Sequence, residues 1–306
     1  MGLDTLALTI ISMGLPCCLL ALGVFLSFRI LDFADMTAEG SVLIGGALCA
    51  ALIYKGMPPV VATLLGMLAG GCCGFITGCL NRFLKIPKLL SGIITMTAAG
   101  SVALMIMGFA FGSPFASRVD IEASQTIFSF LDPAIFKGWQ EVIVEGVIVI
   151  LIMTLAYFFF GTEYGIAIRA TGINERMAKS QGINTTAATI ICITISNSLI
   201  GLTGALMAQV GNGFSSTSAT GYLVVGLASI LIGETLFGKR SFRNYLISIC
   251  LGSLIYWTIL DVLTFIFSVP ADLEKVIYAI LIVIALCLPM LKKEIKKRFT
   301  RKKKEA

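Results

Sequence analysis

Residues 142–160 read Val142-Ile-Val-Glu-Gly-Val-Ile-Val-Ile-Leu-Ile-Met-Thr-Leu-Ala-Tyr-Phe-Phe-Phe160, an apolar stretch with a single charged side chain, Glu145. A helix of this length is about 28 Å long, close to the roughly 30 Å hydrocarbon thickness of a bilayer. The stretch lacks the alternation of polar and apolar residues that a membrane β-strand would show. It therefore predicts a helix that crosses a lipid bilayer.

The same pattern extends over the rest of the chain. Of its 306 residues, 57% are hydrophobic and 13% are charged, whereas soluble domains have about 45–50% apolar and about 25% charged residues. Such a chain would expose large apolar patches in water. We therefore predict one all-α, polytopic membrane domain over residues 1–306, with about nine spans at 5–27, 40–54, 59–80, 91–110, 142–160, 186–209, 222–238, 244–267 and 274–291.

The basic residues fall mostly on one side of the predicted bundle. If the spans alternate and the C-terminus is cytoplasmic, all but four of the 23 Lys and Arg lie inside, and the exceptions are Lys55, Arg118, Lys137 and Lys275. The positive-inside rule favours this orientation, with the N-terminus outside. The basic tail 292–306 is then expected to face anionic lipid in the cytoplasmic leaflet rather than nucleic acid.

Residue types that support catalysis are scarce. The chain has no histidine, which removes the commonest general base and most zinc sites. Its nine cysteines lie in predicted spans, where small apolar packing residues are expected. Residues 233–240 resemble a P-loop, but Arg240 replaces the required hydroxyl residue. We therefore expect no enzyme, cofactor or metal site, and an energy source in a partner; a membrane enzyme such as a lipid-modifying transferase is the least favoured alternative.

Two segments repeat at a constant spacing of 181 residues. Phe33-Ala-Asp-Met-Thr-Ala-Glu-Gly40 corresponds to Phe214-Ser-Ser-Thr-Ser-Ala-Thr-Gly221, and the same spacing matches Gly23 with Gly204. An odd number of predicted spans separates the two copies, so the second copy would be inverted. Inverted repeats with a polar break in each half are typical of alternating-access transporters, because irregular backbone at membrane depth must line protein or water.

The polar residues at these breaks are candidates for a translocation path or gate. Intramembrane carboxylates are costly and usually face the interior of a bundle. The alternative is an ordinary cytoplasmic loop in which Thr37 and Glu39 cap the next helix. Threonines in the span 91–110 are further candidates, although threonine often bonds to its own helix backbone. The full set is Asp32, Phe33, Asp35, Thr37, Glu39, Thr95, Thr97, Asn212, Phe214, Ser215, Ser216 and Thr217.

The polar segment 161–183 follows the quoted span on its cytoplasmic side. We predict a helix over 162–170, a break at Gly172, and a second short helix that begins at Asn174 and ends at Gly182. Two short helices would offer a docking surface for a soluble partner, although a merely solvated loop is also compatible with the pattern. On the opposite side, we expect segment 111–141 to form an interfacial or re-entrant helix where a solute-binding partner could dock.

The spacing from Thr162 to Ile183, Thr-x-x-Gly-x-x-x-Arg-Ala-x-Gly-x-Asn-x-x-x-Ala-x-x-x-Gly-Ile, resembles the coupling loop of ABC importer permeases of the branched-chain amino acid and ribose type. Residues 28–40 and 221–234 fit the same family, and the resemblance extends over nearly the whole chain. It implies that the loop inserts into a cleft on a partner ATPase. The coupling residues it implies are Thr162, Gly165, Arg169, Ala170, Gly172, Asn174, Ala178 and Gly182.

The resemblance also implies partners and a substrate class. The expected complex has two permease copies, identical or different, two ABC ATPase subunits and an extracellular or periplasmic solute-binding protein, in a bacterial cytoplasmic membrane. The subgroup it resembles most implies an amino acid, possibly aromatic. The chain departs from the branched-chain type, which often has histidine where Asp35 stands, and from the ribose type, which usually has an extra basic N-terminal helix. The main alternative is an ion-coupled secondary transporter with ion sites among Asp32, Asp35, Glu39 and Asp261.

Overall fold

The computed structural model describes residues 3–130, 139–238, 241–267 and residue 283. The elements used below are α1 (Leu3–Val24), the π-helix η1 (Phe25–Ile30), α2 (Thr37–Tyr54), α3 (Pro59–Arg82), α4 (Lys88–Phe111), β1 (Arg118–Asp120), the 3-10 turns η2 (Ala123–Gln125) and η3 (Ile127–Phe130), α6 (Trp139–Phe159), α7 (Glu163–Ile173), α8 (Glu175–Ser180), α9 (Thr185–Val210), β2 (Gly213–Ser215), α10 (Tyr222–Phe237) and α11 (Phe242–Phe267).

Seven of the described helices are long and apolar enough to cross a membrane. They lie at Leu8–Ile30, Thr37–Tyr54, Pro59–Arg82, Lys88–Phe111, Trp139–Phe159, Thr185–Val210 and Phe242–Thr264, and α10 is a shorter apolar helix. The prediction of a polytopic helical bundle is confirmed. The first eight predicted segments each coincide with a described helix, whereas the ninth, 274–291, and the tail 292–306 lie outside the described residues. A total of nine spans therefore stays a prediction.

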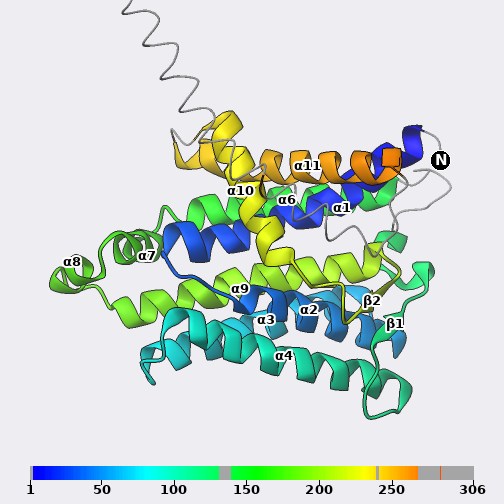
Figure 1. Cartoon of the computed structure of the whole chain (residues 1–306), viewed down its shortest axis with the longest axis horizontal. Coiled ribbons are helices and arrows are strands. Elements are labelled where there is room, and N and C mark those ends of the chain that lie inside the picture. Colours follow the sequence, from blue (N-terminus) through cyan, green and yellow to red (C-terminus); the bar gives the residue numbers. More distant parts are fainter. Residues whose placement is uncertain (1–2, 131–138, 239–240, 268–282, 284–306) are drawn as a thin grey trace, which may run out of the picture.

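The helices form two interlocking groups (Figure 1). Helix α9 packs with α2 and α3, and α1 packs with α11, α6 and α9. Glycines allow this close approach: a Cβ on Gly70 would lie 2.5 Å from the carbonyl oxygen of Asn197, and one on Gly66 would lie 2.7 Å from that of Gly45. Lipid gives no hydrophobic drive for helices to associate, so small residues at the interfaces provide the packing contacts.

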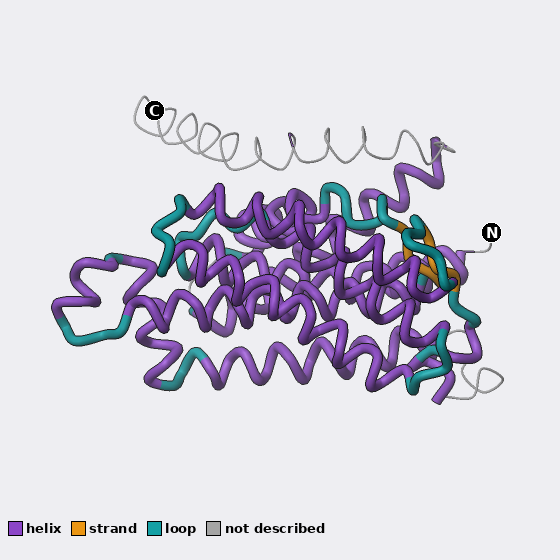
Figure 2. The backbone as a smooth tube through the Cα atoms, turned by 90° about the horizontal axis from the view of Figure 1, so that it is seen from below, coloured by secondary structure: helices purple, strands orange, loops and turns teal. Residues whose placement is uncertain are grey.

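The two ends of the bundle differ. Helices α7 and α8 project from one end, whereas the N-terminus, β1 and β2 lie at the other (Figures 1 and 2). Arg82 pairs with Glu175 of α8 at the first end. Lys55 lies over the ring of Phe109 where α2 ends, 3.7 Å from the ring centroid. Arg82 and Lys55 therefore lie at opposite ends of the bundle.

Segment 111–141 differs from the expected helix. Its described part contains β1, which pairs antiparallel with β2 so that Val119 faces Phe214, followed by two 3-10 turns. The backbone N–H of Ile127 donates to the side-chain oxygen of Gln209, at 2.8 Å. Short polar and Pro-containing pieces bond here to α9 and β2, because they are too irregular to satisfy their own backbone as a helix. Residues 131–138 lie outside the described residues.

Candidate functional site

The loop between α6 and α9 folds as two short helices, as predicted. The hydroxyl of Thr162 accepts from the backbone N–H of Gly165 at the start of α7, and the side chain of Asn174 accepts from that of Met177 at the start of α8, at 3.1 Å. Gly182 follows α8 with a φ of +82°, a left-handed conformation that suits glycine. The loop is therefore two short helices, each with a side-chain cap at its start.

The position of the break was predicted wrongly. Helix α7 continues through Gly172 and ends at Ile173, and Asn174 separates the two helices. A methyl group on Gly172 would overlap the carbonyl oxygen of Ile30 and lie 2.9 Å from the Cα of Leu31. Gly172 is needed for this close approach to the end of the first membrane segment, and the helix does not end there.

Arg169 braces the loop. Its Nη2 donates to the carbonyl oxygen of Phe160 at 2.9 Å, and its guanidinium carbon lies 5.6 Å from the ring centroid of Phe242. A Cβ on Gly165 would overlap the backbone of Phe160, so the backbones of α7 and of the end of α6 are also in direct contact at this point. Arg169 and Gly165 therefore tie α7 to the membrane helices.

Two alanines complete the inner face of the loop. The carbonyl of Ala170 accepts from the N–H of Asn174 at 3.1 Å, which closes α7. Ala178 is buried, and its carbonyl accepts from the N–H of Ile183. All eight predicted coupling residues thus lie in α7, in α8 or directly beside them. Most of them make caps or close contacts that hold these two helices in place.

Four large apolar side chains of the loop are exposed, among exposed charged residues such as Arg176 and Lys179. The side chains of Tyr164, Ile166, Ile173 and Met177 are all exposed, and Ile173 reaches 85%. Exposed apolar patches on polar surfaces mark interaction sites. Sequence analysis named none of these four, although apolar residues in an otherwise polar loop were the available signal.

A charge pair holds the loop against α3. Arg82 donates to the carboxylate of Glu175 and to the hydroxyl of Thr189. The guanidinium of Arg82 lowers the pKa of the Glu175 carboxyl below its usual range. The loop thus contacts α3 and α6 as well as the end of the first membrane segment.

The first polar break contains a fully buried carboxylate. Asp35 Oδ1 accepts from the N–H of Thr37 at 2.9 Å, and Oδ2 accepts from Nδ2 of Asn197 at 2.6 Å. Asn197 Oδ1 accepts from Ser41 Oγ at 2.7 Å, and the Thr37 and Thr77 hydroxyls are 2.7 Å apart. Burial raises the pKa of Asp35, while the bonds from Thr37 and Asn197 oppose the rise. This network joins α2, α3 and α9.

The neighbouring positions behave differently from Asp35. Asp32 is exposed, with a φ of +51°, and its carbonyl accepts from Lys88 Nζ at 2.8 Å. Phe33 is buried, with the Lys88 ammonium 5.7 Å from its ring centroid. Thr37 is the first residue of α2, and the cap position, Met36, makes no side-chain hydrogen bond. Asp35 thus accepts from the first N–H of α2, as in a capped loop, but it is also fully buried and bonded to Asn197 of α9, which an ordinary solvated loop would not show.

The second polar break lies at the end of the bundle that carries β1 and β2. Phe214 is buried, and a Cβ on Gly46 would lie 2.5 Å from its ring. Ser215 Oγ lies 3.1 Å from Thr217 Oγ1 and 2.9 Å from Ser218 Oγ. A cavity of about 200 Å³ opens beside this cluster, and its lining includes Met13, Arg118, Phe214, Ser215, Ser218 and Tyr222.

The remaining residues of this break are held by their backbone. Ser216 N–H donates to the carbonyl of Ser117 at 2.8 Å, and the carbonyl of Asn212 accepts from the N–H of Ile121 at 3.0 Å. Asn212 has a φ of +47°. These contacts fix the break to the 111–130 segment.

Glu39 connects the two breaks. Its Oε1 accepts from the backbone N–H of Gly221 at 3.1 Å, so the first turn of α2 meets the start of α10. A carboxylate at a helix N-terminus is favourable because unpaired N–H groups and the helix dipole converge there. The structure thus brings together the two segments that the repeat singled out.

The threonines of α4 do not join this group. Thr95 and Thr97 both donate to carbonyls of their own helix, and Thr97 lies on the exposed face. Asn197 was missed by sequence analysis, although an amide in the middle of the apolar segment 186–209 could have indicated it. Within the described ranges, no three Cys, Asp or Glu side chains come together in a way that could hold a metal ion.

Comparison with known proteins identifies the family. The family model described as branched-chain amino acid transport system/permease component matches residues 6–286. A tyrosine transport system permease protein of Clostridioides difficile (strain R20291) is 38% identical over 251 residues, 81% of this chain and 80% of that protein.

More distant relatives have other named substrates. A galactofuranose transporter permease protein of Escherichia coli (strain K12) is 27% identical over 80% of this chain and 68% of its own length. A probable branched-chain amino acid transport permease protein of Methanocaldococcus jannaschii is 25% identical over 78% of this chain and 77% of its own. No solved structure matches. By the match over residues 6–286, the chain belongs to the branched-chain amino acid transport permease family and is a permease subunit of an ABC transporter.

Proposed function

We propose that this chain imports an amino acid, with a partner ABC ATPase docked on α7 and α8. The observation that carries the proposal is the exposed apolar surface of Tyr164, Ile166, Ile173 and Met177, on a loop braced against the membrane helices. A transport subunit needs a docking element of this kind, because a conformational change in a soluble ATPase can reach the membrane helices only through a contact between the two proteins.

The orientation we propose places α7 and α8 in the cytoplasm, and the N-terminus and the β1–β2 ribbon outside. The basic residues of the α3–α4 connection and of α7 and α8 gather at one end, and the positive-inside rule favours a cytoplasmic location for that end. The β1–β2 end, with its polar cavity of about 200 Å³, would then receive a solute-binding protein.

We propose that the chain contains an inverted repeat, which would support alternating access. At the 181-residue spacing, α1, α2 and α3 correspond to α9, α10 and α11. Helix α1 runs toward the α7–α8 end, whereas α9 runs away from it (Figure 1). The two breaks meet through Glu39 and Gly221, where rocking of one copy against the other would change access.

The proposed substrate class follows from the relatives. The 38% identical protein is named for tyrosine, a 25% identical relative for branched-chain amino acids, and relatives of 26% and 27% identity for sugars. We propose two permease copies and two ATPase subunits in the complex, because coupling by closure of an ATPase pair acts on two loops at once.

The test is transport by purified complex in proteoliposomes. The chain is co-purified with a candidate ABC ATPase from the same organism and supplied with a candidate solute-binding protein. Uptake of radiolabelled tyrosine and leucine is then measured with enclosed ATP or with a sodium or proton gradient alone. We expect uptake only with ATP. Uptake driven by the gradient without ATP would support the ion-coupled alternative and overturn the proposal.

A variant tests the docking surface directly. Ile173→Glu should remove ATPase co-purification and reduce uptake more than about tenfold, because it places a charge in an apolar contact. Phe115→Glu is the control, since Phe115 is also exposed but lies at the β1–β2 end. ATPase binding that survives Ile173→Glu would contradict the assignment of the docking surface.

A further inference from the structure

The first membrane segment ends in an unusual helical form. After Val24 it continues as the π-helix η1, and the N–H of Leu31 donates to the carbonyl of Leu26 at 3.1 Å. π-Helical turns are rare and occur often at functional sites, because they widen the helix and disturb its packing. This segment is therefore a place where a small displacement can be absorbed or passed on.

One side of η1 contacts the proposed docking loop. Gly172 of α7 lies against the carbonyl of Ile30, with no room for a methyl group between them. Because two backbones are in direct contact here, movement of α7 toward the membrane must displace the end of η1.

The opposite side of η1 is tied to α10 by an ion pair. Arg29 Nε donates to Glu234 Oε1 at 2.8 Å, and Nη2 donates to Oε2 at 2.5 Å. The hydroxyl of Tyr245 on α11 also donates to Glu234. A two-point guanidinium–carboxylate pair fixes direction as well as distance. The same tyrosine ring packs edge-on against Phe25 of η1, with centroids 4.5 Å apart.

Helices α10 and α11 are locked together beyond this pair. A Cβ on Gly233 would overlap the carbonyl oxygen of Ser248, and one on Gly252 would overlap that of Ser229. Such close backbone contact makes α10 and α11 move as one body. The Arg29–Glu234 pair is therefore a polar link between η1 and the α10–α11 pair, and α10 is the helix that follows the second polar break.

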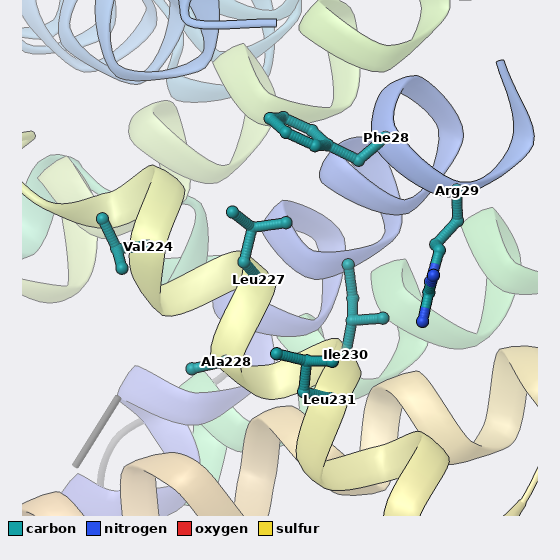
Figure 3. A pocket seen from close by; sticks show the side chains of 7 residues that line it. All are labelled: Phe28, Arg29, Val224, Leu227, Ala228, Ile230 and Leu231. Atoms are coloured by element: carbon teal, nitrogen blue, oxygen red, sulfur yellow. The ribbon is translucent and has the colours of Figure 1, made fainter. Parts of the chain in front are cut away.

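Space is available beside the link. A cavity of about 310 Å³ separates η1 from α10, with Phe28 and Arg29 on one side and Leu227, Ile230 and Leu231 on the other (Figure 3). Close packing would prevent two surfaces from sliding. The ion pair therefore joins η1 and α10 beside a region that is not closely packed.

From these contacts we propose that Arg29 and Glu234 are positioning residues that transmit movement of the α7–α8 loop to α10. The path runs from Gly172 to Ile30, then from Arg29 to Glu234, and so to the start of α10 that Glu39 contacts. The inference rests on the proposed function and adds the residues through which ATPase movement reaches the gate.

The experiment separates ATP hydrolysis from uptake in the same proteoliposomes. Glu234→Gln should leave ATP hydrolysis and ATPase co-purification within about twofold of wild type and reduce uptake per ATP at least about tenfold, within the usual range of coupling between sites. The charge exchange Arg29→Glu with Glu234→Arg should restore a large part of that ratio. Thr235→Ala is the matched control, because its hydroxyl donates to Leu231 of its own helix.

Three results would overturn the proposal. The first is an unchanged uptake per ATP in Glu234→Gln. The second is a parallel loss of ATP hydrolysis and uptake, which would indicate a merely structural role. The third is no recovery of uptake per ATP in the charge exchange. If Glu234→Gln fails to fold, Tyr245→Phe provides the second variant, since it keeps the ring contact with Phe25 and removes one donor to Glu234; it should lower uptake per ATP by a smaller factor. Failure of the proposed function would differ, because wild-type uptake would then show no dependence on ATP.

Discussion

At the scale of single residues, Asp35 shows how a carboxylate is accommodated deep in the bundle. Both of its oxygens accept hydrogen bonds, one from the backbone of Thr37 and one from the amide of Asn197. An uncompensated buried charge is expensive, whereas a paired one is tolerated. The sequence indicated Asp35 as unusual, but its partner is 162 residues away and only the fold shows it.

We predict that Asn197→Ala lowers the free energy of unfolding by about 3 kcal/mol, because it leaves the Asp35 carboxylate without its amide donor. The measurement is thermal unfolding of the purified protein in detergent. Ser198→Ala is the control, since the Ser198 hydroxyl donates to Thr194 of its own helix. The cost of Asn197→Ala should shrink in an Asp35→Asn background, and equal costs in both backgrounds would show that the two side chains are not coupled.

The same residue predicts a pH dependence. Burial raises the pKa of Asp35, so the folded protein keeps this proton to higher pH than the unfolded chain does. The contribution of Asp35 to stability is then complete below the ordinary carboxyl pKa and is lost as pH rises through the raised value. Asp35→Asn should flatten this part of the profile of unfolding temperature against pH; an identical profile would contradict the prediction.

At the scale of elements, the sequence correctly predicted two short helices between α6 and α9, but it placed the break between them at Gly172 instead of Asn174. Gly172 suggested a helix end because glycine is a poor helix former. In the structure it stays helical, because its missing side chain lets α7 meet Ile30. Local propensity alone cannot distinguish a glycine that ends a helix from one that allows a close contact.

Gly172→Ala should therefore destabilise the protein by about 1–3 kcal/mol through steric overlap, despite the better helix propensity of alanine. Gly146→Ala on α6 is the matched control, because Gly146 has nothing within 4 Å of the added Cβ and should be neutral or slightly stabilising. Both are measured as shifts in unfolding temperature. Equal shifts for the two variants would mean that the contact between α7 and η1 is not tight.

At the scale of the whole molecule, the two ends of the bundle carry different chemistry. One carries the α7–α8 loop, with exposed apolar side chains and basic neighbours, and the other carries a β-ribbon and a cavity partly lined by polar side chains. The contacts inferred to transmit movement run from α7 at the first end, through Arg29 and Glu234, to α10, which begins after the second break. A transporter of this kind needs both ends to be connected by packed elements rather than by flexible chain.

The orientation can be checked with single cysteines in a background from which native cysteines have been removed. A membrane-impermeant thiol reagent should label Phe115→Cys on intact cells or spheroplasts, and label Met177→Cys only after the membrane is opened, because both side chains are exposed but lie at opposite ends. The reverse labelling pattern would invert the topology and place the docking loop outside.

The sequence by itself determined the class of protein, the approximate helices and the two-helix form of the loop between α6 and α9, because bilayer thickness fixes span length and lipid excludes charged residues. Only the tertiary structure decided that Asp35 meets Asn197, that Glu39 meets Gly221 and that Arg29 meets Glu234. The physical reason is distance along the chain: helical patterns are local, whereas these polar contacts join residues more than 150 positions apart and depend on how glycine-lined helices pack.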